Sequence, residues 1–278
     1  MIDTIQYIGL SLLVIMFIIE LVHDWKERKQ LYHRQETLNN ICIGLVLIFS
    51  SFISKGVLYG AFQLSSAIQI FDMQYTFESF LLLIMLSDFS YYWYHRISHT
   101  VAWFWAAHSV HHSASHYNIS ITFRQSWTNQ LSGQFLFWLW LPFVGFDPTW
   151  VFASYQLCMF YQTWLHTELI GKLHPVFEFI FNTPSHHRVH HGSNLNYLDK
   201  NHGGILIIWD RLFGTFQEET EQPVYGLSGK KNPDTLSEIM WREWKHLFKM
   251  VWKAGSFGAG IKCLFQPPGL NEQVLKGE

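Results

Sequence analysis

The sequence predicts an all-α, multi-pass transmembrane protein with a cytoplasmic helical cap that carries histidine boxes. Hydrophobic residues make up 49% of the 278 residues and charged residues only 14%, against roughly 25% charged residues in a typical soluble domain. In addition, 13 of the 16 histidines fall between His95 and His202. The formal net charge of −2 offers no basic surface for a polyanion, so no nucleic-acid partner is expected.

Three apolar stretches are long enough to cross a bilayer as helices. They cover residues 4–22, 41–62 and 77–94, and a span needs about 20 mostly apolar residues. The first stretch lacks a basic segment before it and a small-residue cleavage site, so we expect a retained helix and not a signal peptide. Residues 1–76 are therefore predicted to form N-terminal transmembrane helices.

A fourth apolar stretch, residues 131–165, contains a turn signal. Pro142, Gly145, Asp147 and Pro148 interrupt it, and such residues mark turns. We expect two shorter helices, which form either a hairpin that crosses the membrane or one that only dips into it.

The orientation follows from the basic residues, because cationic loops stay in the cytoplasm. The loop after the first span carries Lys26, Arg28, Lys29 and Arg34, whereas the loop after the second span carries no Lys or Arg. The first loop is therefore predicted inside, and the third span returns inward. All the histidine clusters then share the cytoplasmic face.

The C-terminal segment, residues 218–278, contains an amphipathic pattern from Lys230 onward. Apolar positions recur among basic residues at helical spacing, which is typical of a helix at the membrane interface. The alternative is a helix that packs against the histidine-bearing part of the chain. The apolar positions are Ile239, Trp241, Trp244, Leu247, Phe248, Val251 and Trp252.

The histidines form three motifs with helical spacing, HRISH, HSVHH and HRVHH. In HRISH they stand at positions i and i+4, and in HSVHH and HRVHH at i, i+3 and i+4, so those of each motif project from one helix face. A single motif of this kind is commonly structural, but three together place many imidazoles at one point, and buried neutral imidazoles need partners. A metal supplies them. The candidate ligands are His95, His99, His108, His111, His112, His187, His190 and His191.

The number of candidate ligands predicts two metal ions. One first-row metal ion accepts about six ligands at most, and a structural zinc takes four. Imidazole suits iron, zinc, copper and nickel alike, so ligand type leaves the element open. The dispersed residues Cys42, Cys158 and Cys263 indicate neither a disulfide framework nor a cysteine zinc site.

Further histidines are expected at or beside this site. His166, in QTWLHTE after the apolar hairpin, is expected to be a ninth ligand. On a helix His186 would point about 100° away from His187, so we expect it to support the ligands from outside. We assign the same supporting role to His202 in DKNHGG, where a ligand or a plain loop residue is the alternative.

Asp88 lies seven residues before His95, on the same face of the third predicted span. An acid at that depth needs a partner. We predict that it accepts the ring N–H of a ligating histidine, or binds structural water, and so orients the site. Bonding to a Tyr or Trp of another helix is the alternative.

The order of these motifs resembles the fatty acid hydroxylase and sterol desaturase superfamily of membrane diiron proteins. The resemblance covers roughly residues 87–216 and looks closest to the alkylglycerol monooxygenase branch and its bacterial relatives. The segments that carry it are DFSYYWYHRISH, FWAAHSVHHSASHYNIS, FRQS, YQTWLHTE, NTPSHHRVHHG and DKNHGGILIIWDRLFGTF.

The resemblance implies a catalytic domain at residues 77–217 and a cytoplasm-facing diiron centre. The histidines of the three motifs would bind the two iron ions, and the centre would use O2 to oxidise an unactivated C–H bond of a lipid such as a sterol, a fatty acyl chain or an alkylglycerol. Electrons would come from outside the chain, from a redox protein or a reduced pterin such as tetrahydrobiopterin, because the sequence carries no iron–sulfur or dinucleotide motif.

We expect hydroxylation as the outcome, with desaturation second. A zinc-dependent membrane hydrolase and a metal transporter are the alternatives from other classes. A hydrolase needs only three or four ligands, and a transporter places its ligands at mid-membrane, so the excess of histidines beyond the span ends favours the oxygenase.

Overall fold

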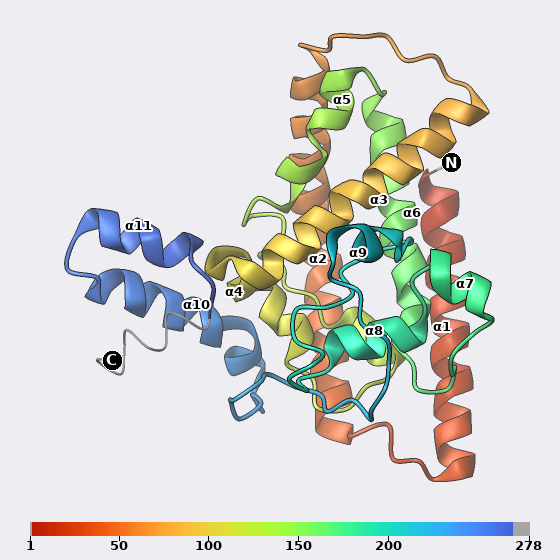
Figure 1. The fold of residues 1–278 in the computed structure, drawn as a ribbon, viewed down its shortest axis with the longest axis vertical. Coiled ribbons are helices and arrows are strands. Elements are labelled where there is room, and N and C mark those ends of the chain that lie inside the picture. The colour runs from red at the N-terminus through yellow and green to blue at the C-terminus, as the bar shows by residue number, and fades with distance from the viewer. Residues whose placement is uncertain (1, 269–278) are drawn as a thin grey trace.

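The computed structural model describes residues 2–268, and among these its regular secondary structure is helical (Figure 1). Three 3-10 helices, η1 Ile119–Phe123, η2 Gln134–Trp138 and η3 Gln162–Leu165, accompany the α-helices. The α-helices are α1 Ile2–Glu27, α2 Arg34–Ser66, α3 Phe77–Thr100, α4 Ala102–His112, α5 Trp140–Val144, α6 Pro148–Tyr161, α7 Pro175–Ile180, α8 Pro184–His191, α9 Ile208–Phe213, α10 Leu236–Lys253 and α11 Phe257–Phe265. The all-α prediction is confirmed.

The predicted apolar stretches lie within long helices. Residues 4–22, 41–62 and 77–94 fall inside α1, α2 and α3, which run on into their polar flanks. Thr76 caps the start of α3 with a reciprocal capping box, in which the Thr76 side chain accepts from the Ser79 N–H and the Ser79 side chain accepts from the Thr76 N–H.

The predicted turn within residues 131–165 is present. It separates η2 and α5 from α6, and Asp147 caps α6 ahead of Pro148. Gly145 has φ +126°, and a Cβ at this position would lie 2.3 Å from the Phe71 carbonyl oxygen. A side chain therefore cannot be accommodated there, which explains the glycine.

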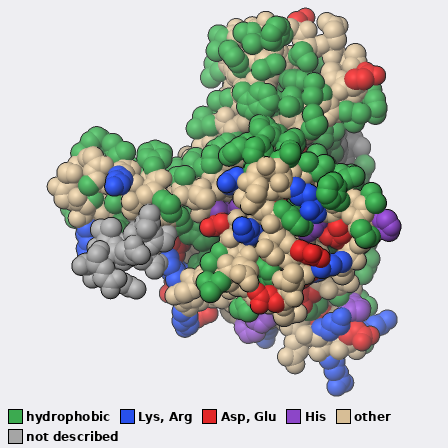
Figure 2. All heavy atoms as spheres, viewed as in Figure 1, with side chains coloured by type: hydrophobic (Ala, Val, Ile, Leu, Met, Phe, Trp, Pro, Cys, Tyr) green, Lys and Arg blue, Asp and Glu red, His purple; other side chains and the backbone are tan. Residues whose placement is uncertain are grey.

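The surface divides into an apolar part and a charged part. In Figure 2 apolar side chains cover the upper region, and Lys, Arg, Asp and Glu gather over the lower region. By length and composition, Tyr7–Glu27 is long and apolar enough to span a membrane, and the bent pair Arg34–Ser50 and Ile53–Ser66 adds a second span if it is counted as one. The multi-pass topology stays a prediction.

The core forms where α3 crosses α6, η2 and α5. Leu83, Tyr91, Trp138 and Tyr155 are buried there, and Trp138 donates its indole N–H to the Ser87 hydroxyl at 2.9 Å. Aromatic side chains thus hold the C-terminal half of α3, which carries the first histidines, against the hairpin.

The C-terminal helices form an arm beside α4 (Figure 1). The predicted amphipathic helix is α10, and its Trp244 and Leu247 pack on Ala102, Ala106 and Ala107 of α4. One face of α10 therefore packs against the histidine-bearing part of the chain, which was the alternative to a position at the membrane interface. Trp252, 91% exposed, lies off this interface, and a position at the membrane surface stays a prediction. Helix α11, which packs on α10 and α4, was not predicted.

Candidate metal centre

Four segments bring the nine predicted ligands together. The C-terminal turns of α3 carry His95 and His99, α4 carries the second motif, His166 follows η3, and α8 carries the third motif. Helix α8 begins at Thr183, whose side chain accepts from the His186 N–H, with Pro184 at the first helical position. All nine side chains are buried.

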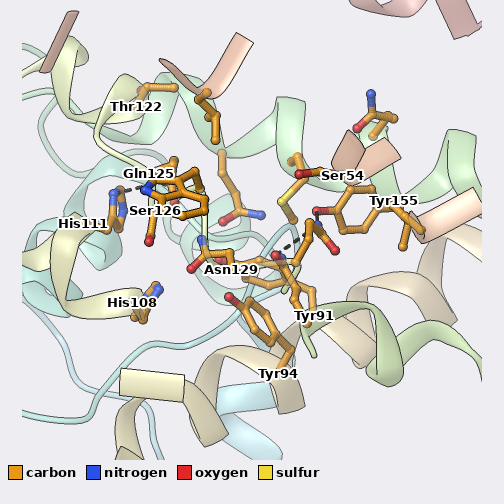
Figure 3. A pocket seen from close by; sticks show the side chains of 18 of the residues that line it. Ser54, Tyr91, Tyr94, His108, His111, Thr122, Gln125, Ser126, Asn129 and Tyr155 are labelled. Atoms are coloured by element: carbon orange, nitrogen blue, oxygen red, sulfur yellow. Dashed lines mark hydrogen bonds between the residues drawn. The ribbon is translucent and has the colours of Figure 1, made fainter. Parts of the chain in front are cut away.

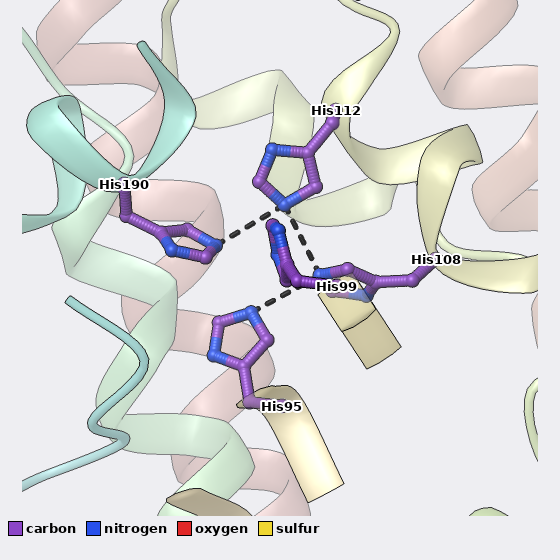
Figure 4. A group of neighbouring side chains, drawn as sticks. All are labelled: His95, His99, His108, His112 and His190. Carbon is purple, nitrogen blue, oxygen red and sulfur yellow. Dashed lines mark hydrogen bonds between the residues drawn. The ribbon is translucent and has the colours of Figure 1, made fainter. Parts of the chain in front are cut away.

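The nine histidines divide into two adjoining groups. Within each group the possible ligand atoms lie within 4.8 Å of one another. The rings of His112 and His191 stack across the two groups with centroids 4.4 Å apart. The first group, drawn in Figure 4, is His95, His99, His108, His112 and His190; the second is His111, His166, His187 and His191.

The distances between ring nitrogens suit a metal. The Nε2 atoms of His95 and His108 lie 3.0 Å apart, and those of His112 and His190 lie 3.1 Å apart. In the second group, the Nε2 atom of His166 lies 3.1 Å from that of His111. A metal–imidazole bond measures about 2.0–2.1 Å, so two ligands at right angles have nitrogens about 3 Å apart.

Backbone carbonyls fix which ring nitrogen faces the centre. A carbonyl can only accept, so a ring nitrogen bonded to it carries the proton. The Nδ1 atoms of His95 and His190 each lie 2.9 Å from a carbonyl oxygen, of His202 and Lys200 respectively. Their Nε2 atoms therefore present lone pairs inward.

In the second group, His166 repeats this arrangement, because its Nδ1 donates to the Gln162 carbonyl at 3.1 Å. His111 Nδ1 lies 3.3 Å from the Arg124 carbonyl oxygen and 3.1 Å from the Gln125 side-chain amide nitrogen. The Nε2 lone pair of His166 therefore faces the Nε2 atoms of His111 and His187, at 3.1 and 3.0 Å. His99 Nε2 and His191 Nε2, both buried, have no hydrogen-bond partner among the described residues. The donor set thus fits two metal ions.

The electrostatics of the site also favour metal binding. Burial, with added repulsion from neighbouring imidazoles, holds the pKa of most of these histidines well below its usual range; they are His95, His108, His111, His112, His187, His190 and His191. Burial lowers the pKa of His166 to about 3. These imidazoles are neutral at pH 7, which is the form that binds metal.

Asp88 does not bond a histidine ring among the described contacts, which corrects that prediction. Its carboxylate accepts from the Ile205 and Leu206 N–H groups at 2.6 and 3.0 Å and from the Trp209 indole at 2.9 Å. The bond to a tryptophan matches the alternative. Asp88 therefore holds the 202–206 loop, whose His202 carbonyl orients His95.

His186 and His202 lie beside the two groups and outside them. His186 points away, with Nε2 2.9 Å from a Glu178 carboxylate oxygen. The His202 ring centroid lies 5.0 Å from that of His99. Asp210, which was not among the predicted site residues, accepts from the His202 and Gly203 N–H groups at 2.7 Å each.

Two further supporting residues were missed. The buried Arg124 donates to the Val110 carbonyl at 3.0 Å and to Asn40 Oδ1 at 2.9 Å, so it ties the end of α4 to α2. Burial lowers the pKa of Arg124 to about 10. Glu20 of α1 accepts from the Ile119 N–H at 2.7 Å and from the Thr167 hydroxyl. An acid inside the first apolar stretch was the available signal for Glu20.

Two cavities reach the histidines. One, of about 350 Å³, lies between α2, α3 and α6 and is lined by His108, His111 and His166, so it touches both groups (Figure 3). The other, of about 570 Å³, is lined by His99, His112, His190 and His191 together with Asp199 and Lys230. The histidine groups therefore border two cavities with different linings.

Comparison with known proteins finds sequence similarity to enzymes that act on lipids. A family model described as fatty acid hydroxylase matches residues 80–215. Alkylglycerol monooxygenase of Xenopus tropicalis is 34% identical over 263 residues, which are 92% of this chain and 57% of that protein. The Homo sapiens alkylglycerol monooxygenase is 44% identical over 186 residues, 66% of this chain and 40% of that protein.

A bacterial lipid enzyme also matches. Ornithine lipid hydroxylase OlsE of Rhizobium tropici is 29% identical over 163 residues, 56% of this chain and 47% of that protein. The chain thus spans between 40% and 57% of the length of these relatives. No solved structure matches it. Residues 80–215, which contain all nine clustered histidines, therefore match the fatty acid hydroxylase family, and the chain is similar to the alkylglycerol monooxygenases.

Proposed function

We propose that the chain is a membrane diiron oxygenase that hydroxylates an unactivated C–H bond of a lipid with O2 and external electrons. The observation that carries the proposal is the pair of adjoining groups of five and four buried imidazoles, whose possible ligand atoms lie within 4.8 Å of one another in each group. Such a set exceeds the needs of one ion. The similarity to lipid oxygenases supports iron as the metal.

His95, His99, His108, His112 and His190 would hold one iron, and His111, His166, His187 and His191 the other. The pair of ions would supply the electrons that split O2 and the oxidising power for the C–H bond. The chain itself supplies neutral ligands, backbone carbonyls that fix their tautomers, and a buried, largely aromatic surrounding that limits water.

The cavity of about 350 Å³ supports a lipid substrate. It reaches both histidine groups and is walled by Leu58, Phe152 and Met159 from the apolar part of the molecule. The substrate class proposed is a sterol, fatty acyl or alkylglycerol chain, with hydroxylation as the main outcome. Desaturation is the second outcome, because it shares the abstraction of hydrogen from the same bond.

The cavity of about 570 Å³ supports access for the external electron donor. It approaches His99, His112 and His190 from another side and has the polar groups of Thr100, Ser193 and Asp199 in its lining. A small redox protein docked over it, or a reduced pterin such as tetrahydrobiopterin inside it, would reach the first group without crossing the lipid cavity.

A first experiment measures metal content and oxygen reactivity on detergent-purified protein produced with iron. About two irons per chain and reductant-dependent O2 uptake are expected, and His111→Ala and His190→Ala should each lose metal and uptake. His116→Ala is the control, since His116 bonds Glu36 outside both groups. One zinc per chain without oxygen reactivity after iron reconstitution would favour a zinc hydrolase, and metal uptake into proteoliposomes a transporter.

A further inference from the structure

The short helix α11 exposes a stripe of large apolar side chains. Phe257, Ile261 and Phe265 are exposed and stand four residues apart, so they share one face of the helix. The buried residues of α11 are the small Gly260 and Cys263. The helix thus packs on the rest of the arm through small residues and leaves its largest apolar side chains outside. Such a surface indicates a partner.

Helix α10 adds a second apolar stripe to the same arm. Trp241, Phe248 and Trp252 are exposed, and their spacing places them on one helix face. This face adjoins the one that packs on α4 through Trp244 and Leu247. Tryptophan and phenylalanine at the edge of a packed face are typical of helices that lie at a membrane–water interface.

A row of basic residues borders the stripe of α10. Lys245, Lys249 and Lys253 are exposed and follow one another at intervals of four residues. Glu243 of the same helix is buried and bonds Lys230 at 3.0 Å, so it does not neutralise this row. An apolar stripe flanked by lysines is complementary to acyl chains beneath negatively charged headgroups.

The arm also stands at the right height for this contact. The Trp241 ring meets that of Trp127 edge to face, with centroids 5.5 Å apart. Trp127 precedes a segment in which Leu131 and Leu136 are exposed as well. In Figure 2 apolar side chains lie along the upper edge of the arm, where the apolar region meets the charged region. A bilayer around the apolar region would have its surface there.

We propose that the α10–α11 arm binds the surface of an anionic bilayer. Its apolar stripes enter the outer part of the acyl-chain layer, and Lys245, Lys249 and Lys253 lie beside lipid phosphates. The partner is an anionic phospholipid of the leaflet on the histidine side. Because α10 packs on α4, the bound arm holds the second histidine motif at a fixed height beside the bilayer. The docking surface is the same whatever reaction the histidines catalyse.

Lipid contact of the stripe is measured on the full-length protein in nanodiscs. Phe257→Cys, in a Cys42→Ser, Cys263→Ser background, carries a polarity-sensitive fluorophore. Its emission should shift to the blue and be quenched by nitroxides attached near the lipid headgroups. Leu195→Cys is the matched control and should show neither effect, because Leu195 is 87% exposed, against 86% for Phe257, but lies outside the arm. Ile261→Cys reports on the same stripe if the loss of Phe257 disturbs docking.

The dependence on lipid charge is measured with the same labels. Nanodiscs with about 30% phosphatidylglycerol should give roughly twofold more quenching than nanodiscs of phosphatidylcholine alone, since lysines near an anionic surface strengthen binding. The double variant Lys249→Gln, Lys253→Gln should lose most of this difference. Lys172→Gln, Lys231→Gln is the control of equal charge, because these lysines bond Glu218 and Asp234 outside the two helices.

The outcomes separate the possible occupants of the stripe. Quenching confined to the stripe labels, increased by phosphatidylglycerol and dependent on Lys249 and Lys253, supports the proposal. No blue shift at either stripe position in folded protein overturns it. A blue shift without quenching by lipid nitroxides also overturns it, because a second copy of the chain or another protein would then cover the stripe. Equal quenching in both lipids refutes the anionic partner. Thermal unfolding shows that each variant is folded.

Discussion

At the scale of single residues, the contribution of each histidine depends on which ring nitrogen carries the proton. Helical spacing predicted which histidines share a face, and the structure brings all nine together. Spacing could not predict the tautomers, because they depend on carbonyls of Lys200, His202 and Gln162, two of which come from a loop that follows the third motif. The neighbours His186 and His187 show the difference, since one bonds Glu178 and the other joins the second group.

Substitutions of the neighbours His186 and His187 give a prediction with a matched control. His187→Ala should lower bound iron from about two to about one per chain, because it removes one of only four imidazoles in its group. His186→Ala should keep both irons and cost about 1–3 kcal/mol of stability, since it removes the His186 partner of the half-buried Glu178 carboxylate. Metal analysis and thermal unfolding of both variants provide the check. Equal metal loss in the two would contradict the assignment of His187.

Arg124 shows what the sequence could not indicate at this scale. An arginine in a loop is ordinarily exposed, yet Arg124 is 1% exposed and its guanidinium bonds α2, α4 and Ser113 together. Arg124→Lys should lower the free energy of unfolding by about 2–4 kcal/mol, because a single ammonium cannot replace bonds made from three nitrogens. Thermal unfolding in detergent measures this. The exposed Arg34→Lys serves as the control, and comparable melting of the two proteins would refute the structural role.

At the scale of elements, the sequence predicted the helices and the hairpin turn but not the loop that completes the site. The turn was readable because Gly145 and Pro148 act locally. The 202–206 loop was not, because Asp88 holds it across 117 positions of sequence. Helix α11 was missed for a local reason: Gly258 and Gly260 weaken its helical pattern, and packing on α10 and α4 stabilises it.

The role of the 202–206 loop can be tested at Gly204, where the loop packs most tightly against its neighbours. A Cβ on Gly204 would lie 2.6 Å from Asp88 Oδ1 and 2.8 Å from Cys158 Sγ. Gly204→Ala should therefore displace the loop, cost about 1–3 kcal/mol and weaken metal binding in the first group through the His202 carbonyl. Gly60→Ala is the matched control, because nothing lies within 4 Å of its Cβ and alanine favours the α2 helix. Unchanged stability and metal content in Gly204→Ala would contradict the role given to this loop.

At the scale of the whole molecule, the first loop and the histidines lie at the same end. The Asn118 side chain donates to the Leu31 carbonyl at 2.7 Å, and Glu36 accepts from the Ser115 N–H at 2.7 Å. The basic residues predicted this shared side. The number of crossings is harder to predict, because the C-terminal half of α3 buries Asp88, Tyr91 and Tyr92 against protein and not against lipid. Its apolar pattern therefore does not distinguish a span from a core helix.

Cysteine labelling tests this arrangement in cells. After Cys42→Ser and Cys263→Ser, single variants Lys29→Cys in the first loop, Leu195→Cys beside the histidines and Asp72→Cys between α2 and α3 are exposed to a membrane-impermeant maleimide. Asp72 lies in the loop at the opposite end of α2 from the first loop (Figure 1). If α2 crosses the membrane and the histidines face the cytoplasm, Asp72→Cys reacts in intact cells, and Lys29→Cys and Leu195→Cys react only after permeabilisation. Reaction of Lys29→Cys and Leu195→Cys but not of Asp72→Cys in intact cells would reverse the orientation. Reaction of all three from one side would mean that α2 does not cross the membrane. The rule that cationic loops stay in the cytoplasm would then not apply, because α2 would lie within one leaflet.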